Sequence, residues 1–349
     1  MSDLVNNNPA ELTMPDDVLM RIQNVKKYFP VTKGAFKKVI GNVKAVDDVS
    51  LDIVKGQTLG IVGESGCGKT TLGKGIMRLY RPTAGQMLLR GEDGTVRDLL
   101  TLPKEESFAT RRRIQMIFQD PYASFDPMKN IYTAFDEPMA IHHLGNRAQR
   151  KEQIAEILKV VNLQPEYMYR YPHEFSGGQR QRICIARALA MKPEMIVCDE
   201  PVSALDVSIQ AQIMNLMKKL QKEMGLTYVF IAHDLSVVQY MSDRVAVMYL
   251  GKVVETADSE SLYNNQAHPY TQALLSAVPI PKVGAKKDPI LLEGDVPSPL
   301  NPPTGCRFHP RCRFCTEKCK QVEPQLLPLK SNPGHKVACH LYEGQQITE

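Results

Sequence analysis

The residues best suited to chemistry lie in a glycine-rich stretch, LGIVGESGCGKTTL, at residues 59–72. They fit the pattern G-x-x-x-x-G-K-[ST], in which glycines let backbone N–H groups approach phosphate oxygens closely. The lysine can reach the β- and γ-phosphates, and the threonine hydroxyl can ligate Mg²⁺. The flanking residues predict a buried strand before the loop and a helix after it, whose N-terminus favours an anion. The sequence therefore predicts a nucleotide phosphate site made of Gly63, Glu64, Ser65, Gly66, Cys67, Gly68, Lys69, Thr70 and Thr71.

A second candidate is the pair of acids that ends the apolar run EMIVCDE at residues 194–200. Asp199 closes a predicted buried strand, where its carboxylate can hold Mg²⁺ through water. Glu200 can act as a general base or orient the attacking water. An acid at a strand end is more often part of a solvated turn. After a phosphate-binding loop, however, a hydrophobic run that ends in Asp-Glu favours the catalytic interpretation.

A third candidate, FSGGQRQR at residues 175–182, opens a predicted helix. Its serine and glycines would present N–H groups and a hydroxyl as a second anion site, although a serine there also suits a plain helix cap. The stretch resembles LSGGQ, the signature of the ABC-type ATPases, with Phe175 at a packing position where leucine is usual. The resemblance covers roughly residues 20–275. It implies an α/β fold of the P-loop NTPase type, an ABC ATPase core with an antiparallel β subdomain and an inserted helical subdomain.

The resemblance also implies roles for residues outside these three stretches. Gln119 would contact Mg²⁺ and the attacking water, and His233 would reach the γ-phosphate. Phe29 stands where the family has an adenine-stacking aromatic, with Tyr28 as the alternative, and Asp206 lies in a segment that matches the D-loop. The implied catalytic residues are Glu200, His233 and Gln119, and the implied Mg²⁺ residues are Thr70, Gln119 and Asp199.

One phosphate-binding loop motif occurs in the sequence. In ABC proteins the signature of one subunit completes the ATP site of another, so that two ATP molecules lie at the interface. The resemblance therefore implies that a second polypeptide is needed, and that the signature acts across the interface through Ser176, Gly177, Gly178 and Gln179.

Longer stretches resemble the second ATPase subunit, the F-type subunit, of the oligopeptide and dipeptide importers. They include KKYFPVTKG, FQDPYASFDP and PVSALDVSIQAQ. Such a subunit hydrolyses ATP to power peptide import and pairs with a different ATPase beneath two transmembrane permeases and an extracytoplasmic binding protein. The segment QDPYASFDP would lie where the permeases dock. Nickel importers share most of this core, so a nickel or other small-solute importer stays open, as does a soluble ABC ATPase that is not coupled to a transporter.

Five cysteines gather near the C-terminus, in GCRFHPRCRFCTEKC and VAC. In a reducing cytosol such a group indicates a metal rather than disulfides. Cys306, Cys312, Cys319 and Cys339 resemble the importers' C-terminal pattern, which in some members ligates a [4Fe–4S] cluster. Cys315 is a fifth thiol outside that pattern, so a Zn²⁺ site that uses Cys312, Cys315 and Cys319 remains an alternative.

Strand and helix patterns that alternate along the chain predict a parallel sheet covered on both faces. Strand-like alternation over residues 18–55 predicts an antiparallel sheet, interrupted by a basic loop from Lys33 to Gly41. We expect a flexible N-terminus at residues 1–17, an ABC ATPase domain at 18–277 with a helical subdomain at about 120–190, and a small Pro- and Cys-rich extension of the oligopeptide-transporter type at 278–349.

Composition narrows the partners of the chain. Its 349 residues carry 43 basic and 38 acidic side chains, a formal net charge of +5, which is too mild to predict a nucleic-acid partner. No stretch approaches the roughly 18 consecutive apolar residues of a membrane span, and the N-terminus lacks the features of a secretory signal. We therefore expect a peripheral protein that partner subunits hold at the cytoplasmic face of the membrane.

Overall fold

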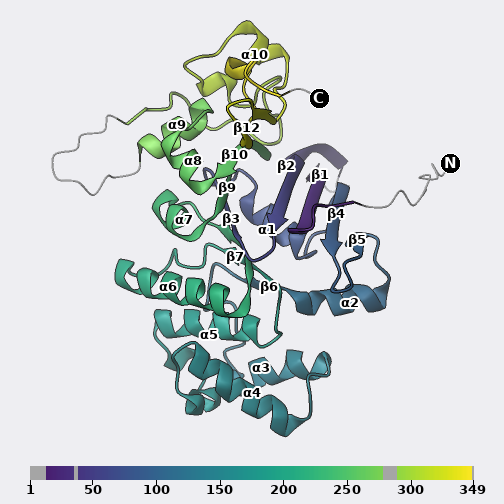
Figure 1. The fold of residues 1–349 in the computed structure, drawn as a ribbon, viewed down its shortest axis with the longest axis vertical. Coiled ribbons are helices and arrows are strands. Elements are labelled where there is room, and N and C mark those ends of the chain that lie inside the picture. Colours follow the sequence, from purple (N-terminus) through teal and green to yellow (C-terminus); the bar gives the residue numbers. More distant parts are fainter. Residues whose placement is uncertain (1–12, 35–37, 278–288, 348–349) are drawn as a thin grey trace.

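The computed structural model describes residues 13–34, 38–277 and 289–347. Figure 1 shows an elongated molecule, with helices α3, α4 and α5 at one end and the C-terminal part around α10 at the other. Two sheets lie between these ends. Of the expected flexible N-terminus, residues 1–12 lie outside the described residues, while Met14 is buried and its carbonyl oxygen accepts a hydrogen bond from Arg90.

The smaller sheet is antiparallel, in the strand order β2-β1-β4-β5. Strands β1 (Val18–Lys33) and β2 (Lys38–Val54) form one long hairpin, in which Lys33 pairs with Lys38. The prediction of a loop from Lys33 to Gly41 is therefore wrong over most of its length, because the two strands continue to pair beyond the core and satisfy each other's backbone groups. Strands β4 (Ala84–Arg90) and β5 (Val96–Asp98) complete this sheet.

Within the described residues, the larger sheet has the order β11-β12-β10-β9-β3-β8-β7-β6. The strands from β9 to β6 run parallel to one another, and β3, β7 and β8 are buried along their whole length, as expected for a sheet covered on both faces. The α/β prediction is thus confirmed. The bounds are β3 (Thr58–Val62), β6 (Ile114–Ile117), β7 (Met195–Asp199), β8 (Thr227–Ile231), β9 (Arg244–Tyr249) and β10 (Lys252–Asp258).

The parallel strands bring the predicted site residues to one edge of this sheet. Ligands of parallel sheets bind at the carboxyl ends of the strands. The glycine-rich loop follows β3, Gln119 lies just beyond β6, Asp199 ends β7, and His233 lies just beyond β8. Helix α1 starts in the loop and packs so closely on the sheet that a Cβ at Gly73 would lie 2.7 Å from Ile231 Cδ1. The helices beside the two sheets are α1 (Lys69–Ile76), α2 (Lys104–Arg113), α6 (Val207–Met224) and α7 (Leu235–Met241).

A group of helices lies between residues 120 and 190, where the sequence predicts an inserted helical subdomain. Its apolar side chains, such as Phe135, Met139, Ile154 and Leu158, are fully buried and join the core beneath the larger sheet. The elements are α3 (Ile131–Ile141), α4 (Arg147–Val160), η1 (Pro165–Tyr169), η2 (Pro172–Glu174) and α5 (Gly177–Leu189).

The C-terminal part packs on the core rather than standing apart from it. Strand β12 pairs with β10, where Glu255 faces Val337 and Thr256 faces Lys336, so it extends the larger sheet. Part of the predicted proline-rich linker, residues 278–288, lies outside the described residues. The elements are α8 (Ser259–Asn264), α9 (Pro269–Ser276), η3 (His309–Arg311), α10 (Glu317–Gln321), β11 (Leu327–Leu329), β12 (Asn332–Val337) and η4 (His340–Tyr342).

The structure contains a long helix, α6, but its sequence is too polar for a bilayer. Across residues 13–34, 38–277 and 289–347, no helix combines the length and the hydropathy needed to cross a membrane.

Candidate functional site

The glycine-rich loop has a backbone that requires its glycines. Gly63 has φ +149° and Gly68 has φ +107°, conformations that side chains with a Cβ rarely adopt. A Cβ at Gly63 would collide with the carbonyl oxygen of Met248, and one at Gly68 would collide with that of Ala45. The loop therefore lies in direct contact with the backbones of β9 and β2, which fix its shape.

Lys69 and Thr70 begin helix α1 and point in different directions. Lys69 is 5% exposed, and its Nζ donates hydrogen bonds to the carbonyl oxygens of Gly63 at 2.7 Å and Glu64 at 3.1 Å. The ammonium group is thus held inside the loop. Thr70 Oγ1 donates to Asp199 Oδ1 at 2.8 Å, which joins the loop to the end of β7. Burial raises the pKa of Asp199, so a bound cation at this carboxylate would favour its ionised form.

Three further predicted residues meet at the same edge. Gln119 Nε2 donates to Glu200 Oε2 at 2.9 Å, and His233 Nδ1 lies 3.3 Å from the same oxygen. Glu200 has the left-handed φ of +47°, and its backbone N–H donates to the carbonyl oxygen of Ile231 at 2.8 Å. This strained conformation turns the Glu200 side chain away from β7 toward the other two.

One cavity of about 360 Å³ gathers nine of the predicted residues. Asp199 contacts the lining through Thr70, while Cys67 is buried behind the loop. Three lining residues were not predicted from the sequence: Val43, Ala45 and Pro299. Pro299 in particular is remote in the chain and gave no signal. The lining consists of Val43, Ala45, Ser65, Gly66, Gly68, Lys69, Thr70, Thr71, Gln119, Glu200, His233 and Pro299.

The two candidate aromatic residues lie on opposite faces of β1, because neighbouring side chains of a strand alternate. Phe29 pairs in register with Val43, which lines the cavity, and its ring packs edge-on against Tyr80 with 5.4 Å between centroids. The hydroxyl of Tyr28 instead donates to the carboxylate of Asp47. The geometry therefore favours Phe29 over Tyr28 as the aromatic nearer the cavity.

The signature stretch caps helix α5. Ser176 Oγ accepts from the backbone N–H of Gln179 at 3.4 Å, and Gln179 Oε1 accepts from that of Ser176 at 3.0 Å. Phe175 is buried against Tyr167, which agrees with the packing role expected for it. Gly178 lies close to α6, where a Cβ would come within 2.7 Å of Ile209 Cγ2.

The structure does not bring the signature to the phosphate loop of the same chain. Ser176, Gly177, Gly178 and Gln179 do not belong to the residues that line the cavity. Asp206, at the start of α6, is exposed and also lies outside that lining.

Four of the C-terminal cysteines lie close enough for their thiols to interact. Burial and the neighbouring thiols raise the pKa of Cys306 to about 12 and that of Cys339 to about 11. Cys306 also interacts electrostatically with the thiols of Cys312 and Cys319. Its backbone N–H donates to the carbonyl oxygen of Cys319 at 2.8 Å. Cys315 lies nearer the surface, with Sγ 3.5 Å from the carbonyl oxygen of Thr316. Nevertheless, in the part of the chain that the structure describes, no group of three or more His, Cys, Asp or Glu side chains is arranged to hold a metal ion.

Comparison with known proteins agrees with this geometry. Residues 46–203 match the family model "ABC transporter", and residues 254–319 match "Oligopeptide/dipeptide transporter, C-terminal region". The chain is 52% identical to the oligopeptide transport ATP-binding protein AppF of Bacillus subtilis, over 93% of this chain and 98% of that protein. It is 50% identical to the putative oligopeptide transport ATP-binding protein YkfD of the same organism, over 95% and 98%.

Solved structures give the same result for the core. The dimeric structure of the ATP-binding cassette MJ0796 bound to ADP and Pi has a TM-score of 0.59 and 30% identity, over 69% of this chain and 98% of that one. From the loop geometry, the two matched regions and these relatives, the chain belongs to the ABC transporter family of ATP-binding proteins, in the group that carries the oligopeptide/dipeptide transporter C-terminal region.

Proposed function

We propose that this chain binds and hydrolyses Mg·ATP to power the import of dipeptides or oligopeptides through an ABC transporter. The observation that carries the proposal is the cavity where Lys69, Thr70, Glu200, Gln119 and His233 converge. The relatives AppF and YkfD, both named as oligopeptide transport ATP-binding proteins, support the peptide substrate.

In this proposal the phosphate loop positions the nucleotide. Backbone N–H groups from residues 63–71 would surround the β-phosphate, and the Lys69 ammonium would exchange its carbonyl partners for phosphate oxygens. Mg²⁺ would neutralise charge on the phosphates. Thr70 and Asp199, already joined at 2.8 Å, would hold the ion together with Gln119. Phe29 would stack on the adenine ring.

The hydrolytic step requires a base beside the γ-phosphate. Glu200 would accept a proton from the attacking water while the water oxygen bonds to the γ-phosphorus and the bond to the β–γ bridging oxygen breaks, giving ADP and phosphate. Gln119 would orient the water, and His233 would donate a hydrogen bond to the γ-phosphate. Their contacts with Glu200 at 2.9 and 3.3 Å support a shared role at one reacting centre.

We further propose that the site is completed by a second ATPase subunit. The signature residues lie outside the cavity lining of their own chain, which fits a role across an interface. The related cassette MJ0796 is dimeric. The partner would be a different ABC ATPase, whose signature faces this phosphate loop while Ser176, Gly177, Gly178, Gln179 and Asp206 serve its site.

A shallow groove offers a place for the membrane subunits. It lies between the core and the helical part, and Phe118, Leu79 and Phe125 line it. Nearby Tyr122 and Met128 are 62% and 83% exposed. We propose that this groove docks a cytoplasmic helix from one of two permeases, which would hold the chain at the cytoplasmic face of the membrane; an extracytoplasmic protein would deliver the peptide.

The segment QDPYASFDP, residues 119–127, also contacts α5, the helix that begins in the signature stretch. The Arg180 guanidinium lies 3.6 Å from the centroid of the Tyr122 ring, and Arg180 Nε donates to the carbonyl oxygen of Pro172 at 2.6 Å. This contact gives a physical route by which docking and signature position could depend on each other.

For the domains we propose the division expected from the sequence, with an ATPase domain at 18–277, its helical subdomain at about 120–190 and an extension at 278–349. The family match at residues 254–319 overlaps the last boundary.

In the extension, we propose that Cys306, Cys312, Cys319 and Cys339 ligate a [4Fe–4S] cluster. Their all-thiol donor set and mutual proximity support it. As the side chains stand they form no metal-holding group, so binding requires them to converge further.

Elemental analysis of protein purified without oxygen tests the metal. Iron with acid-labile sulfide in equal amounts supports the cluster. Zinc alone would assign the site to Zn²⁺, with Cys315 as a candidate ligand, and absence of both would leave free thiols and overturn the proposal.

The transport function is tested by purifying the tagged chain from detergent-solubilised membranes and identifying what accompanies it by mass spectrometry. We expect two multi-spanning permeases and a second ATPase, and peptide uptake that depends on them. Recovery of permeases of the nickel-importer type would show that nickel, rather than peptide, is the transported substrate. A monomer or homodimer alone, in several detergents, would contradict the importer and favour an ABC ATPase without a transporter.

A further inference from the structure

Glu64, the second residue of the phosphate loop, is held from outside the nucleotide cavity. Its backbone N–H donates to the hydroxyl of Tyr270 in α9 at 2.8 Å. Its carboxylate accepts two hydrogen bonds from Arg311, from Nη1 at 2.7 Å and from Nη2 at 3.2 Å. These partners lie 206 and 247 residues further along the chain. The C-terminal part of the chain therefore fixes both the backbone and the side chain of a loop residue.

Arg311 belongs to the segment that carries the cysteines, which we call the cysteine segment (residues 306–319). It ends the 3-10 turn η3 and directly precedes Cys312, whose N–H donates to the carbonyl oxygen of His309 at 3.3 Å. The side chain of Arg311 is 8% exposed and that of Glu64 is 27% exposed. A bidentate pair with so little exposure has a fixed geometry, so displacement of the cysteine segment would move Arg311 away from Glu64.

The contacts around Arg311 are tightly packed. Phe308 is 1% exposed and lies against the rings of Tyr249 and Tyr270, at 5.3 and 5.4 Å between centroids. Arg307 pairs with Asp47 of β2 and also donates to the carbonyl oxygen of Leu250. The cysteine segment is thus linked to Glu64 twice. Phe308 packs on Tyr270, which binds the Glu64 backbone, and Arg311 pairs with the Glu64 carboxylate.

The negative charge of Glu64 predicts how the contact with Arg311 affects nucleotide binding. A carboxylate in a loop that receives phosphate groups repels the nucleotide unless a cation compensates it. Arg311 supplies that cation at the Glu64 carboxylate, whereas Lys69 Nζ contacts the Glu64 carbonyl oxygen. Without Arg311 the negative charge would remain beside the phosphates.

We propose that Arg311 is a positioning residue for the phosphate loop and that it couples nucleotide binding to the conformation of the cysteine segment. This inference rests on the proposed ATP site. Since coupling between two sites is reciprocal, a bound nucleotide also makes the cysteine segment less reactive, and a change at the cysteines weakens nucleotide binding.

The first test is a double-mutant cycle on the full chain, read by equilibrium binding of a fluorescent, non-hydrolysable ATP analogue. Arg311→Gln leaves the Glu64 carboxylate unpaired and weakens binding by roughly tenfold or more, because removal of one partner strands the other charge. Glu64→Gln removes the repelling charge together with the ion pair, and the double variant recovers most of the binding that Arg311→Gln loses. Arg313→Gln, two residues away at an exposed position, is the matched control and binds normally.

The cycle separates an electrostatic role from simple misfolding. A structural defect from Arg311→Gln would persist in the double variant, so failure of Glu64→Gln to rescue would overturn the proposal. Binding by Arg311→Gln within twofold of the unchanged chain would overturn it too.

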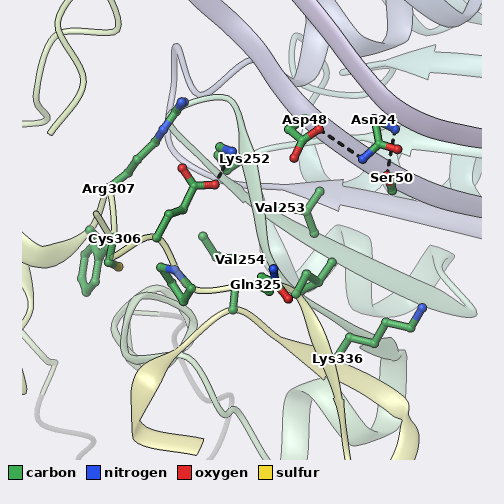
Figure 2. A pocket seen from close by; sticks show the side chains of 15 residues that line it. Asn24, Asp48, Ser50, Lys252, Val253, Val254, Cys306, Arg307, Gln325 and Lys336 are labelled. Carbon is green, nitrogen blue, oxygen red and sulfur yellow. Dashed lines mark hydrogen bonds and ion pairs between the residues drawn. The ribbon is translucent and has the colours of Figure 1, made fainter. Parts of the chain in front are cut away.

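The second test reads the reverse direction, the effect of nucleotide on the cysteines. Cys306 and Arg307 line a cavity between the C-terminal part and the smaller sheet (Figure 2), and its volume of about 360 Å³ gives a small reagent access. Iodoacetamide labelling of Cys306 and Cys312, followed by mass spectrometry, reports opening of the cysteine segment in metal-free protein, because a thiolate bound to a metal does not react with the reagent. The analogue slows labelling severalfold in the unchanged chain and has no effect in Arg311→Gln at concentrations that saturate it.

The outcomes distinguish this inference from the proposed function. If the unchanged chain binds no nucleotide, the ATP site itself fails, and this inference with it. If it binds nucleotide but labelling is the same with and without it, the ATP site stands and the coupling is refuted.

Discussion

Lys69 points into the phosphate loop, where carbonyl groups rather than an acidic side chain hold its ammonium group. An ammonium with carbonyl partners can exchange them for phosphate oxygens without breaking an ion pair. Thr70 differs, since its hydroxyl already contacts the carboxylate expected to hold Mg²⁺. In the proposed site the two neighbouring residues therefore divide phosphate binding and metal binding between them.

Lys69→Ala removes the ammonium from the loop but leaves its glycines in place. We expect ATP affinity to fall by roughly 100-fold, as loss of a charge-assisted contact to phosphate implies. Isothermal titration with an ATP analogue measures this. Lys74→Ala, in the last turn of α1 and outside the cavity lining, is the control. Equal affinities for all three proteins would rule out the role of Lys69.

The two aromatic candidates give opposite expectations. Phe29→Ala removes a ring beside the cavity wall and should weaken ATP binding roughly tenfold, since stacking of a base on an aromatic ring contributes about 1–3 kcal/mol. Tyr28→Ala removes the other ring, together with the hydroxyl that donates to Asp47, and should leave ATP affinity unchanged. Fluorescence titration of both variants decides between them. The reverse order of effects would assign adenine stacking to Tyr28.

At the scale of secondary-structure elements, the sequence predicts most of the site for a physical reason. Apolar runs that end in polar residues mark parallel strands, and the carboxyl ends of such strands meet at one edge. Asp199 was predicted in this way, whereas the roles of Gln119 and His233 were implied by the family resemblance. The extent of the β1–β2 hairpin was not predicted, because Lys33, Lys38 and Gly41 favour a loop, whereas the two strands pair through backbone hydrogen bonds that leave no regular apolar alternation.

Helix α9 has a pH-sensitive start. His268 is fully buried, its Nδ1 accepts from the Tyr270 N–H at 3.1 Å, and burial lowers its pKa to about 4, partly offset by nearby Glu255. Between pH 6.5 and 4 the unfolded chain binds a proton that the folded chain does not. The free energy of unfolding therefore falls as the pH decreases through this window, by about 1.4 kcal/mol per unit from this group, and levels off below it.

Urea unfolding at several pH values, with His268→Asn for comparison, measures this contribution. Asparagine can also cap a helix but does not titrate. We expect the stability advantage of the unchanged chain over the variant to be largest at pH 6.5 and above, and to shrink toward pH 4. A difference that stays constant with pH would show that His268 does not titrate in this way.

At the scale of the whole molecule, the C-terminal extension is part of the ATPase rather than an appendage. Strand β12 joins the larger sheet, Pro299 lines the proposed nucleotide cavity and Arg311 pairs with Glu64 of the phosphate loop. None of this could be read from the sequence. Pairing between residues 80 or more positions apart depends on the folded surface, and a single proline or arginine carries no local pattern that reveals its partner.

The central claim is that Glu200 completes an ATP-hydrolysing site that drives peptide import. Its most direct test is peptide-dependent ATP hydrolysis by the intact complex in proteoliposomes, with and without Glu200→Gln. The unchanged complex should hydrolyse ATP faster when the binding protein delivers peptide. The variant should bind ATP normally but lose turnover by roughly 100-fold, the contribution expected of a general base, and accumulate as an ATP-bound dimer. Hydrolysis by the variant at the unchanged rate would contradict the account.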